Sequence, residues 1–249
     1  MEELRAMQLD MVKMIADIDK LFSSNGIKYT LLGGSVLGAV RHNGFIPWDD
    51  DIDIGVLRKD FDYAESLLSN LEPYTYEFAE DHIIPDAPIG HLHFVNDKYT
   101  LEHSPTIDIF AIDNVPELEK NRKKLRFYAN LHHLSVLRQT PKNRGKAKKL
   151  LVGFILKIVP PFIWNIIKTK SLKKIITFCK SDEYLGNVFG FWTEKEYFPK
   201  NIYEELVLHD FENVKLPIPK EYHQYLTQMY GDYMQLPPVE KRKPKHREF

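Results

Sequence analysis

The N-terminal segment carries apolar side chains at the spacing of an amphipathic helix, followed by Asn25 and Gly26, which commonly end a helix. We expect this helix to pack its apolar face on the core. Its apolar positions are Leu4, Met7, Met11, Met14, Ile15, Ile18, Leu21 and Phe22. The segment lacks a basic start followed by an apolar block, so its pattern does not predict a signal peptide.

Farther along the chain, short apolar runs and runs of alternating polar and apolar residues occur between segments whose apolar residues have helical spacing. After Pro47, charged and apolar residues alternate with a period of two, which is typical of a half-buried strand. A tight turn at Asn96 and Asp97 is expected to join two strands. We predict strands over residues 27–32, 51–56, 74–79, 90–95, 99–103 and 106–112, and helices over residues 35–42 and 58–71. This mixture predicts an α/β or α+β fold built in layers.

The C-terminal part has a weaker pattern. Strand-like and loop signals occur around residues 211–219, a short helix is predicted over residues 220–231, and the chain ends in a basic tail over residues 240–249. We find no internal repeat and no low-complexity linker.

Charge is unevenly distributed along the chain. Residues 120–180 contain 17 Lys and Arg and no Asp or Glu, whereas the remainder has 17 basic and 35 acidic residues, so the two parts carry +17 and −18. The basic region has mostly helical spacing, with a turn at residues 141–145 and a break at Pro160-Pro161. Such separation indicates two surfaces with different roles.

Length and composition indicate a folded protein with a hydrophobic core. The chain has 249 residues, of which 43% are hydrophobic, and this is enough to bury a sizeable core. Cys179 is the single cysteine, which excludes an intrachain disulfide and a cysteine-based zinc cluster. We expect it to be a buried apolar residue in a protein of a reducing compartment.

Several carboxylates around the predicted strand at residues 51–56 form a candidate metal site. Successive strand side chains point to opposite faces, so Asp51 and Asp53 share one face and lie roughly 7 Å apart. Asp108, between isoleucines in another predicted strand, is a third candidate. Mg²⁺ is bound by carboxylates together with substrate phosphates. The alternative is a solvated strand edge, but three such carboxylates combined with a glycine turn favour a metal site.

The glycine turn is Gly33-Gly34-Ser35, between a predicted strand and a predicted helix. Glycines let the backbone approach a ligand closely, and a helix N-terminus offers N–H groups to a phosphate. Glycines also serve turn geometry alone, so the signal gains weight only from the aspartates that follow it. We expect Ser35 to contact the phosphate of a nucleotide whose diphosphate bridges to the metal.

Together these motifs resemble a known family. Gly34-Ser35, Asp51-x-Asp53 and Asp108 resemble the signature of the nucleotidyltransferase superfamily. The run GGSVLGAVRHNGFIPWDDDIDIGVLRKDFD resembles the LicD family within it, whose bacterial members transfer phosphocholine to glycans and whose animal relatives include the fukutin-type ribitol-phosphate transferases. SPTIDIFAIDNVP and FENVKLPIPKEYHQYLTQMYGDYMQLPP, followed by KRKPKH, resemble the family as well.

The resemblance implies a nucleotidyltransferase-like mixed β-sheet flanked by helices, with the basic helices as an insertion. We therefore predict a catalytic core over residues 1–119, a basic helical insertion over residues 120–185 and a C-terminal segment over residues 186–249 that completes the catalytic domain.

By resemblance, Asp51, Asp53 and Asp108 are metal-binding and catalytic carboxylates, with Asp108 as ligand, general base or both. Asp49 is a further ligand or a supporting group, whereas Asp50 is expected to point to the other side of the chain. The metal is Mg²⁺, with Mn²⁺ as an alternative.

The implied reaction moves a phospho-alcohol, in the first place phosphocholine from CDP-choline, onto a sugar hydroxyl of a surface-glycan or teichoic-acid precursor, and CMP leaves. CDP-glycerol, CDP-ribitol and CDP-ethanolamine are alternative donors. A true nucleotidyltransferase would use the same aspartates and release pyrophosphate. A non-catalytic membrane or glycan adaptor would not need the full carboxylate set.

Further residues are candidates for phosphate or substrate contact. Gly33, Gly34, Ser35 and Arg41 form the predicted phosphate-binding set. The candidate substrate contacts are Trp48, His93, Tyr230, Lys241 and Arg242. Each has an ordinary alternative: a solvated helix end for Arg41, loop packing for Trp48, a polar strand face for the histidine and a frayed terminus for the tail.

The basic segment over residues 120–180 is a candidate for contact with an anionic membrane surface. Its apolar stretch is interrupted by Lys157, Pro160-Pro161 and Asn165, so it does not predict a membrane span. A helix packed on the core and a surface for an anionic polymer are alternatives. Nucleic acid is disfavoured because few aromatic residues interleave with the basic ones. The predicted location is the cytoplasm, peripheral at the inner face of the cell membrane, with a lipid-linked glycan as the acceptor.

Overall fold

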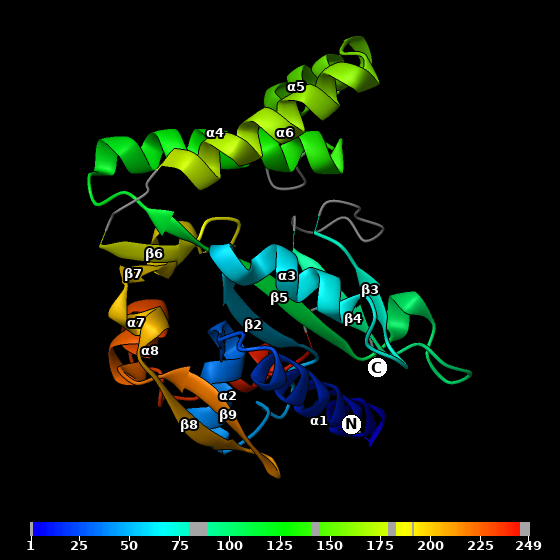
Figure 1. The fold of residues 1–249 in the computed structure, drawn as a ribbon, viewed down its shortest axis with the longest axis vertical. Helices are drawn as coiled ribbons and strands as arrows, with labels where there is room; N and C mark the ends of the chain where they lie inside the picture. Colours follow the sequence, from blue (N-terminus) through cyan, green and yellow to red (C-terminus); the bar gives the residue numbers. More distant parts are fainter. Residues whose placement is uncertain (1, 80–88, 141–144, 179–182, 191, 245–249) are drawn as a thin grey trace.

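The computed structural model describes residues 2–79, 89–140, 145–178, 183–190 and 192–244. A mixed sheet with helices around it forms the main body, and three helices lie together at one end of the long axis (Figure 1). The helices are α1 Glu2–Ser24, α2 Gly33–His42, α3 Arg58–Leu68, α4 Glu119–Leu137, α5 Lys146–Ile158, α6 Pro161–Phe178, α7 Asn201–Glu204 and α8 Tyr222–Tyr230, with 3₁₀ turns η1 Leu101–His103, η2 Thr193–Glu196 and η3 Val239–Lys241. The strands are β1 Tyr29–Leu31, β2 Ile52–Leu57, β3 Thr75–Glu77, β4 Gly90–His93, β5 Thr106–Val115, β6 Tyr184–Asn187, β7 Tyr197–Pro199, β8 Leu206–Phe211 and β9 Val214–Pro219.

Strand β5 is the centre of the main sheet, whose order is β1-β2-β5-β4-β3. It pairs with β2 in parallel on one edge. On its other edge it pairs antiparallel with β4 along its first half and with β6 along its second half. Strands β8 and β9 form a separate hairpin. The fold is therefore mixed α/β with a mixed sheet flanked by helices, as the sequence predicts.

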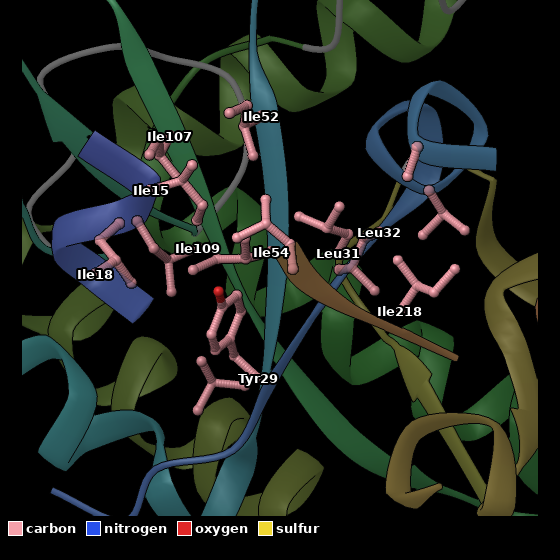
Figure 2. Packing of buried hydrophobic residues seen from close by; sticks show 14 of the residues in the cluster. Ile15, Ile18, Tyr29, Leu31, Leu32, Ile52, Ile54, Ile107, Ile109 and Ile218 are labelled. Atoms are coloured by element: carbon pink, nitrogen blue, oxygen red, sulfur yellow. The ribbon is translucent and has the colours of Figure 1, made fainter. Parts of the chain in front are cut away.

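Helix α1 covers one face of the sheet, as the N-terminal apolar stripe predicts. Ile15 and Ile18 of α1 lie against isoleucines of β2 and β5, and all of these side chains are completely buried (Figure 2). Ile52, Ile54, Ile107 and Ile109 point to this face. Alternation along the strands therefore directs Asp53 and Asp108 to the opposite face.

Helices α4 and α6 pack on each other and on the end of β5 around a second, smaller apolar cluster. This cluster consists of Val115, Leu125, Ala129, Ile175, Val188 and Tyr197. Helix α6 begins at Pro161, in agreement with the predicted break. The predicted turn at residues 141–145 falls largely outside the described residues, as do Cys179 and the last five residues of the tail.

One predicted strand is wrong. Residues 99–103 form a turn and η1 instead of a strand. The side-chain oxygen of Asn96 accepts the N–H groups of Lys98 and Tyr99, and Tyr99 turns into the core, where it is 4% exposed. An Asx turn followed by a buried aromatic side chain has the same apolar pattern as a short strand. Strands β6 and β7 and helix α7 are too short to be predicted from periodicity.

In the described part of the chain, no single helix is long and apolar enough to cross a membrane. Residues Lys149–Ile158 and Pro161–Phe178 pass that test only together, as a pair bent by 112°.

Candidate active site and metal centre

Asp51, Asp53 and Asp108 meet on the face of the sheet opposite α1. Asp53 and Asp108 occupy matched positions on the parallel strands β2 and β5. Each of the three side chains offers one carboxylate oxygen, and these oxygens all lie within 4.8 Å of one another. The structure therefore brings together the three carboxylates predicted from the sequence, in a group that could hold a metal ion.

Asp49, Asp50 and Asp51 form a second such group, also within 4.8 Å, and share Asp51 with the first. The sequence predicts that Asp50 points to the other side of the chain, away from the site. In the structure its side chain is completely buried and belongs to this second group of carboxylates. The expectation assumed an extended strand. Because β2 begins only at Ile52, residues 49–51 lie before the strand without regular secondary structure, and strand alternation does not apply to them.

The electrostatics of Asp53 reflect this crowding of like charges. Burial raises the pKa of Asp53 well above its usual range, and the neighbouring carboxylates Asp51, Asp108 and Asp49 raise it further. Asp51, Asp53 and Asp108 are partly exposed and supply only oxygen ligands, so the donor set fits a hard divalent cation such as Mg²⁺. Such a cation would remove the repulsion that raises the pKa.

Backbone contacts hold the carboxylates in place. The N–H of Asp53 donates to Ser35 Oγ at 2.9 Å, and the N–H of Leu32 donates to the Asp53 carbonyl at 2.9 Å. Gln8 of α1 donates its side-chain amide to the Asp49 carbonyl at 2.9 Å. Ser35 therefore anchors β2 to the start of α2. A hydroxyl that accepts one hydrogen bond keeps a proton to donate, so this anchoring is compatible with phosphate contact.

The two glycines of the turn are required by close packing against the carboxylates. Gly33 has φ +49°, and a Cβ there would lie 3.3 Å from Asp53 Oδ2. A Cβ on Gly34 would lie 2.9 Å from Asp49 Oδ2, closer than such contacts normally occur. Helix α2 thus begins directly beside Asp49 and Asp53.

Helix α8 completes the wall of the site from the C-terminal end of the chain. Tyr225 Oη accepts the Gly33 N–H at 2.8 Å. The Tyr230 hydroxyl would lie 3.6 Å from a Cβ on Gly33, which places this predicted contact residue at the turn. Burial raises the pKa of Tyr230 well above its usual range, and the nearby tyrosine and carboxylates act in the same direction. Tyr230 therefore remains a neutral hydroxyl.

Arg41, Trp48 and Arg242 form a cationic and aromatic rim. The Arg242 guanidinium lies 5.8 Å from the Trp48 ring centre. Arg41 donates to the Tyr233 carbonyl at 2.8 Å, and burial lowers its pKa. Tyr230, Arg242 and Asp49 are close enough to affect that pKa as well. Arg242, distant in sequence, therefore lies beside Trp48 and Arg41, and Arg41 is close enough to Asp49 to be affected by its charge.

The two histidines of β4 and Lys241 of the tail lie in different surroundings. His91, opposite Asp108 on β4, lies with Nδ1 2.8 Å from Asp108 Oδ1. His93 is completely buried, with Nδ1 3.1 Å from Ser104 Oγ and Nε2 3.6 Å from Glu77, so we do not retain it as a substrate contact. Lys241 is exposed on η3.

Glu196 is a site-adjacent carboxylate that sequence reasoning missed. Its side chain is 8% exposed and accepts the Trp192 N–H at 2.9 Å. Burial raises its pKa to about 7, against the opposing effect of that hydrogen bond. Its charge contributes to the raised pKa of Asp53. No motif marks it, because it lies between the short strands β6 and β7.

Comparison with known proteins is consistent with this geometry. Residues 26–141 match a family described as LicD/FKTN/FKRP, nucleotidyltransferase domain. The chain is 30% identical, over 260 aligned positions, to the lipopolysaccharide cholinephosphotransferase LicD of Haemophilus influenzae, with 98% of this chain and 96% of the relative covered. A 42-residue stretch is 50% identical to human ribitol 5-phosphate transferase FKRP, covering 17% of this chain and 8% of the human protein.

The alignment with the Haemophilus influenzae relative spans nearly all of both chains. The family match covers α2, β2 and β5, which carry the glycine turn and the aspartates. The chain therefore belongs to the LicD/FKTN/FKRP family and is an enzyme of the LicD phosphotransferase type.

Proposed function

We propose that the protein transfers a phospho-alcohol from a CDP-linked donor, in the first place phosphocholine from CDP-choline, to a sugar hydroxyl of a glycan precursor. The single observation that carries the proposal is the convergence of Asp51, Asp53 and Asp108 beside the glycine turn. The name of the full-length relative, a lipopolysaccharide cholinephosphotransferase, favours choline and a glycan acceptor.

The carboxylates are proposed to hold Mg²⁺, with Mn²⁺ as an alternative. Asp51, Asp53 and Asp108 would be the ligands, and Asp49 a further ligand or a support. When bound, the cation would neutralise the donor diphosphate and stabilise the charge that develops on the leaving phosphate oxygen.

The chain's own residues would position both reactants. An acceptor hydroxyl oxygen attacks the distal phosphorus of the donor, the bond from that phosphorus to the CMP oxygen breaks, and the hydroxyl proton moves to a carboxylate. Asp108 is our candidate for that carboxylate. The His91 contact at 2.8 Å would hold its orientation.

The donor is proposed to lie along the start of α2. The Gly34 N–H, the Ser35 hydroxyl and Arg41 would face the diphosphate. The N–H groups of Gly33, Ser35 and Val36 are already bonded to Tyr225 Oη and the Leu32 carbonyl. Trp48 and Arg242, which already contact each other, would border the nucleotide or the alcohol. The neutral Tyr230 hydroxyl would donate a hydrogen bond to a phosphate oxygen.

A panel of donors tests this proposal. The purified chain is incubated with Mg²⁺, a lipopolysaccharide or teichoic-acid precursor and CDP-choline, CDP-ethanolamine, CDP-glycerol or CDP-ribitol, and CMP release is measured. We expect CMP release that depends on the acceptor, with CDP-choline as the preferred donor. Release of pyrophosphate from CTP, with no CMP from any CDP-alcohol, would instead identify a true nucleotidyltransferase.

A further inference from the structure

A row of large apolar side chains is exposed along α5 and the first turns of α6, and we call it the α5–α6 ridge. Along α5 the positions recur every three or four residues, so they share one helix face. Each of the six side chains has between 47% and 75% of its surface exposed. The ridge consists of Leu150, Leu151, Phe154, Ile158, Phe162 and Ile166.

The ridge lies away from both apolar clusters. Helix α5 lies in the group of helices at the end of the molecule away from β8 and β9 (Figure 1). Among its described side chains none is fully buried, although the helix is rich in leucine, isoleucine and phenylalanine. A helix of this composition normally buries one face against a partner, and contiguous exposed apolar surface marks an interaction site.

Lysines accompany the ridge. Residues 146–178 contain eight lysines and no Asp, Glu or Arg. Lys146, Lys157, Lys170, Lys173 and Lys174 are exposed. The long lysine side chain can lie along apolar surface while its ammonium group reaches a polar layer. The segment therefore combines apolar and cationic groups without any compensating carboxylate.

We propose that the α5–α6 ridge docks on an anionic lipid bilayer, with the apolar side chains inserted at the boundary between headgroups and acyl chains and the lysines on acidic headgroups. Both kinds of side chain find a favourable environment at such a membrane. The apolar side chains of the ridge would enter the upper acyl layer, and the lysines would be attracted by the negative surface potential. A second copy of the chain would bring eight lysines against eight lysines. An anionic polymer would neutralise the lysines but leave the ridge in water.

This contact goes beyond the proposed transfer reaction. It uses helices outside the carboxylate site and gives a physical reason for a peripheral location at the inner face of the cell membrane. There the enzyme would meet a lipid-linked acceptor without diffusing through the cell interior.

Vesicle flotation of the full chain tests the proposal without donor, acceptor or metal, so its result is independent of the proposed reaction. Vesicles of phosphatidylcholine with about 30% phosphatidylglycerol are compared with phosphatidylcholine alone. We expect the anionic vesicles to bind at least about tenfold more protein, with weaker binding in about 0.5 M NaCl.

Two sets of variants separate the apolar and cationic contributions. L151S combined with F154S should reduce binding to anionic vesicles at least about tenfold, because two inserted side chains are lost. K170Q, K173Q and K174Q together should weaken binding and reduce its salt dependence. The matched control is L208S on β8, where Leu208 is 62% exposed but lies outside the ridge. It should bind as the unmodified chain does. F162S is a second ridge variant if the double variant does not fold.

Three results would overturn the proposal. The first is unchanged vesicle binding in the ridge variants. The second is a concentration-dependent dimer, detected by light scattering, that L151S with F154S abolishes, which would identify a second copy as the occupant. The third is binding to a soluble polyanion such as polyphosphate without binding to vesicles.

Discussion

Asp53 and Asp108 stand side by side on the neighbouring parallel strands β2 and β5, with ligand oxygens within 4.8 Å of each other and of Asp51. Two ordinary strands with the isoleucines 52, 54, 107 and 109 under α1 are enough to produce this pair, because alternation turns the residue between two buried isoleucines to the opposite face. This arrangement brings carboxylates close enough to repel one another, and a bound cation would offset that repulsion.

D53N and D108N should each lower turnover at least about a hundredfold, because an amide supplies a neutral oxygen in place of an anionic ligand. CMP release at saturating donor measures the loss. The matched control is D97N, an exposed loop aspartate, which should keep full activity. Turnover above about half of the original in D53N would contradict the carboxylate mechanism.

The same D53N substitution should stabilise the metal-free protein. Removing one of several crowded carboxylates relieves repulsion, and a gain of about 1 kcal/mol in the free energy of unfolding raises Tm by about 2–4 °C in a chain of this size. Thermal unfolding in EDTA measures the shift. A lower Tm for D53N than for the unmodified chain in EDTA would show that Asp53 stabilises the metal-free fold, contrary to this prediction.

G34A should impair the site more than the fold. A Cβ at this position lies 2.9 Å from Asp49 Oδ2, so the carboxylate must move, and activity should fall at least about tenfold. The control is G145A, where a Cβ meets nothing within 4 Å. If G34A and G145A have equal activity, the position of Asp49 is unimportant for turnover.

Much of this site could be predicted from the sequence, because its key residues come from regular elements. Strand periodicity predicted Asp51 and Asp53 on one face with Asp108 as a third carboxylate, and the glycines marked the close approach to α2. The parallel pairing of β2 with β5, which sets Asp53 beside Asp108, left no signal in the sequence. Asp50 was misplaced because it lies in the irregular segment before β2 begins at Ile52, where strand alternation does not hold. Glu196 was missed because its surroundings form by tertiary packing of the short strands β6 and β7, which leave no periodic pattern.

His91 should act as a positioning residue for Asp108. H91A removes the imidazole that lies 2.8 Å from the Asp108 carboxylate, and such losses cost about 10–100-fold in metal affinity or activity. Calorimetric titration with Mn²⁺ and turnover at saturating metal separate the two effects. H103A, at an exposed position on η1, is the control. Unchanged Mn²⁺ affinity and turnover in H91A would exclude this role.

Glu196 should make the stability of the protein depend on pH. Because its pKa in the folded state, about 7, lies above the ordinary value of 4.5, the folded state holds the proton more tightly than the unfolded state. The associated stability is therefore complete below about pH 4.5 and is lost as pH rises through about 7. The full loss is about 3 kcal/mol.

E196Q should flatten this part of the pH profile. Urea unfolding between pH 5 and about 8, in EDTA, measures the free energy of unfolding of both proteins. The difference between the variant and the unmodified chain should grow with pH across this window. A pH-independent difference would show that Glu196 does not titrate there.

The proposed reaction is a transfer at the distal phosphate of a CDP-alcohol. Phosphorus NMR of a reaction with CDP-choline, Mg²⁺ and a glycan acceptor follows every phosphorus atom at once. We expect the two diphosphate signals to decay together while CMP and a sugar phosphodiester appear in equal amounts, and we expect neither product with D53N. Formation of pyrophosphate and a nucleotidylated product from CTP, with CDP-choline left intact, would contradict it.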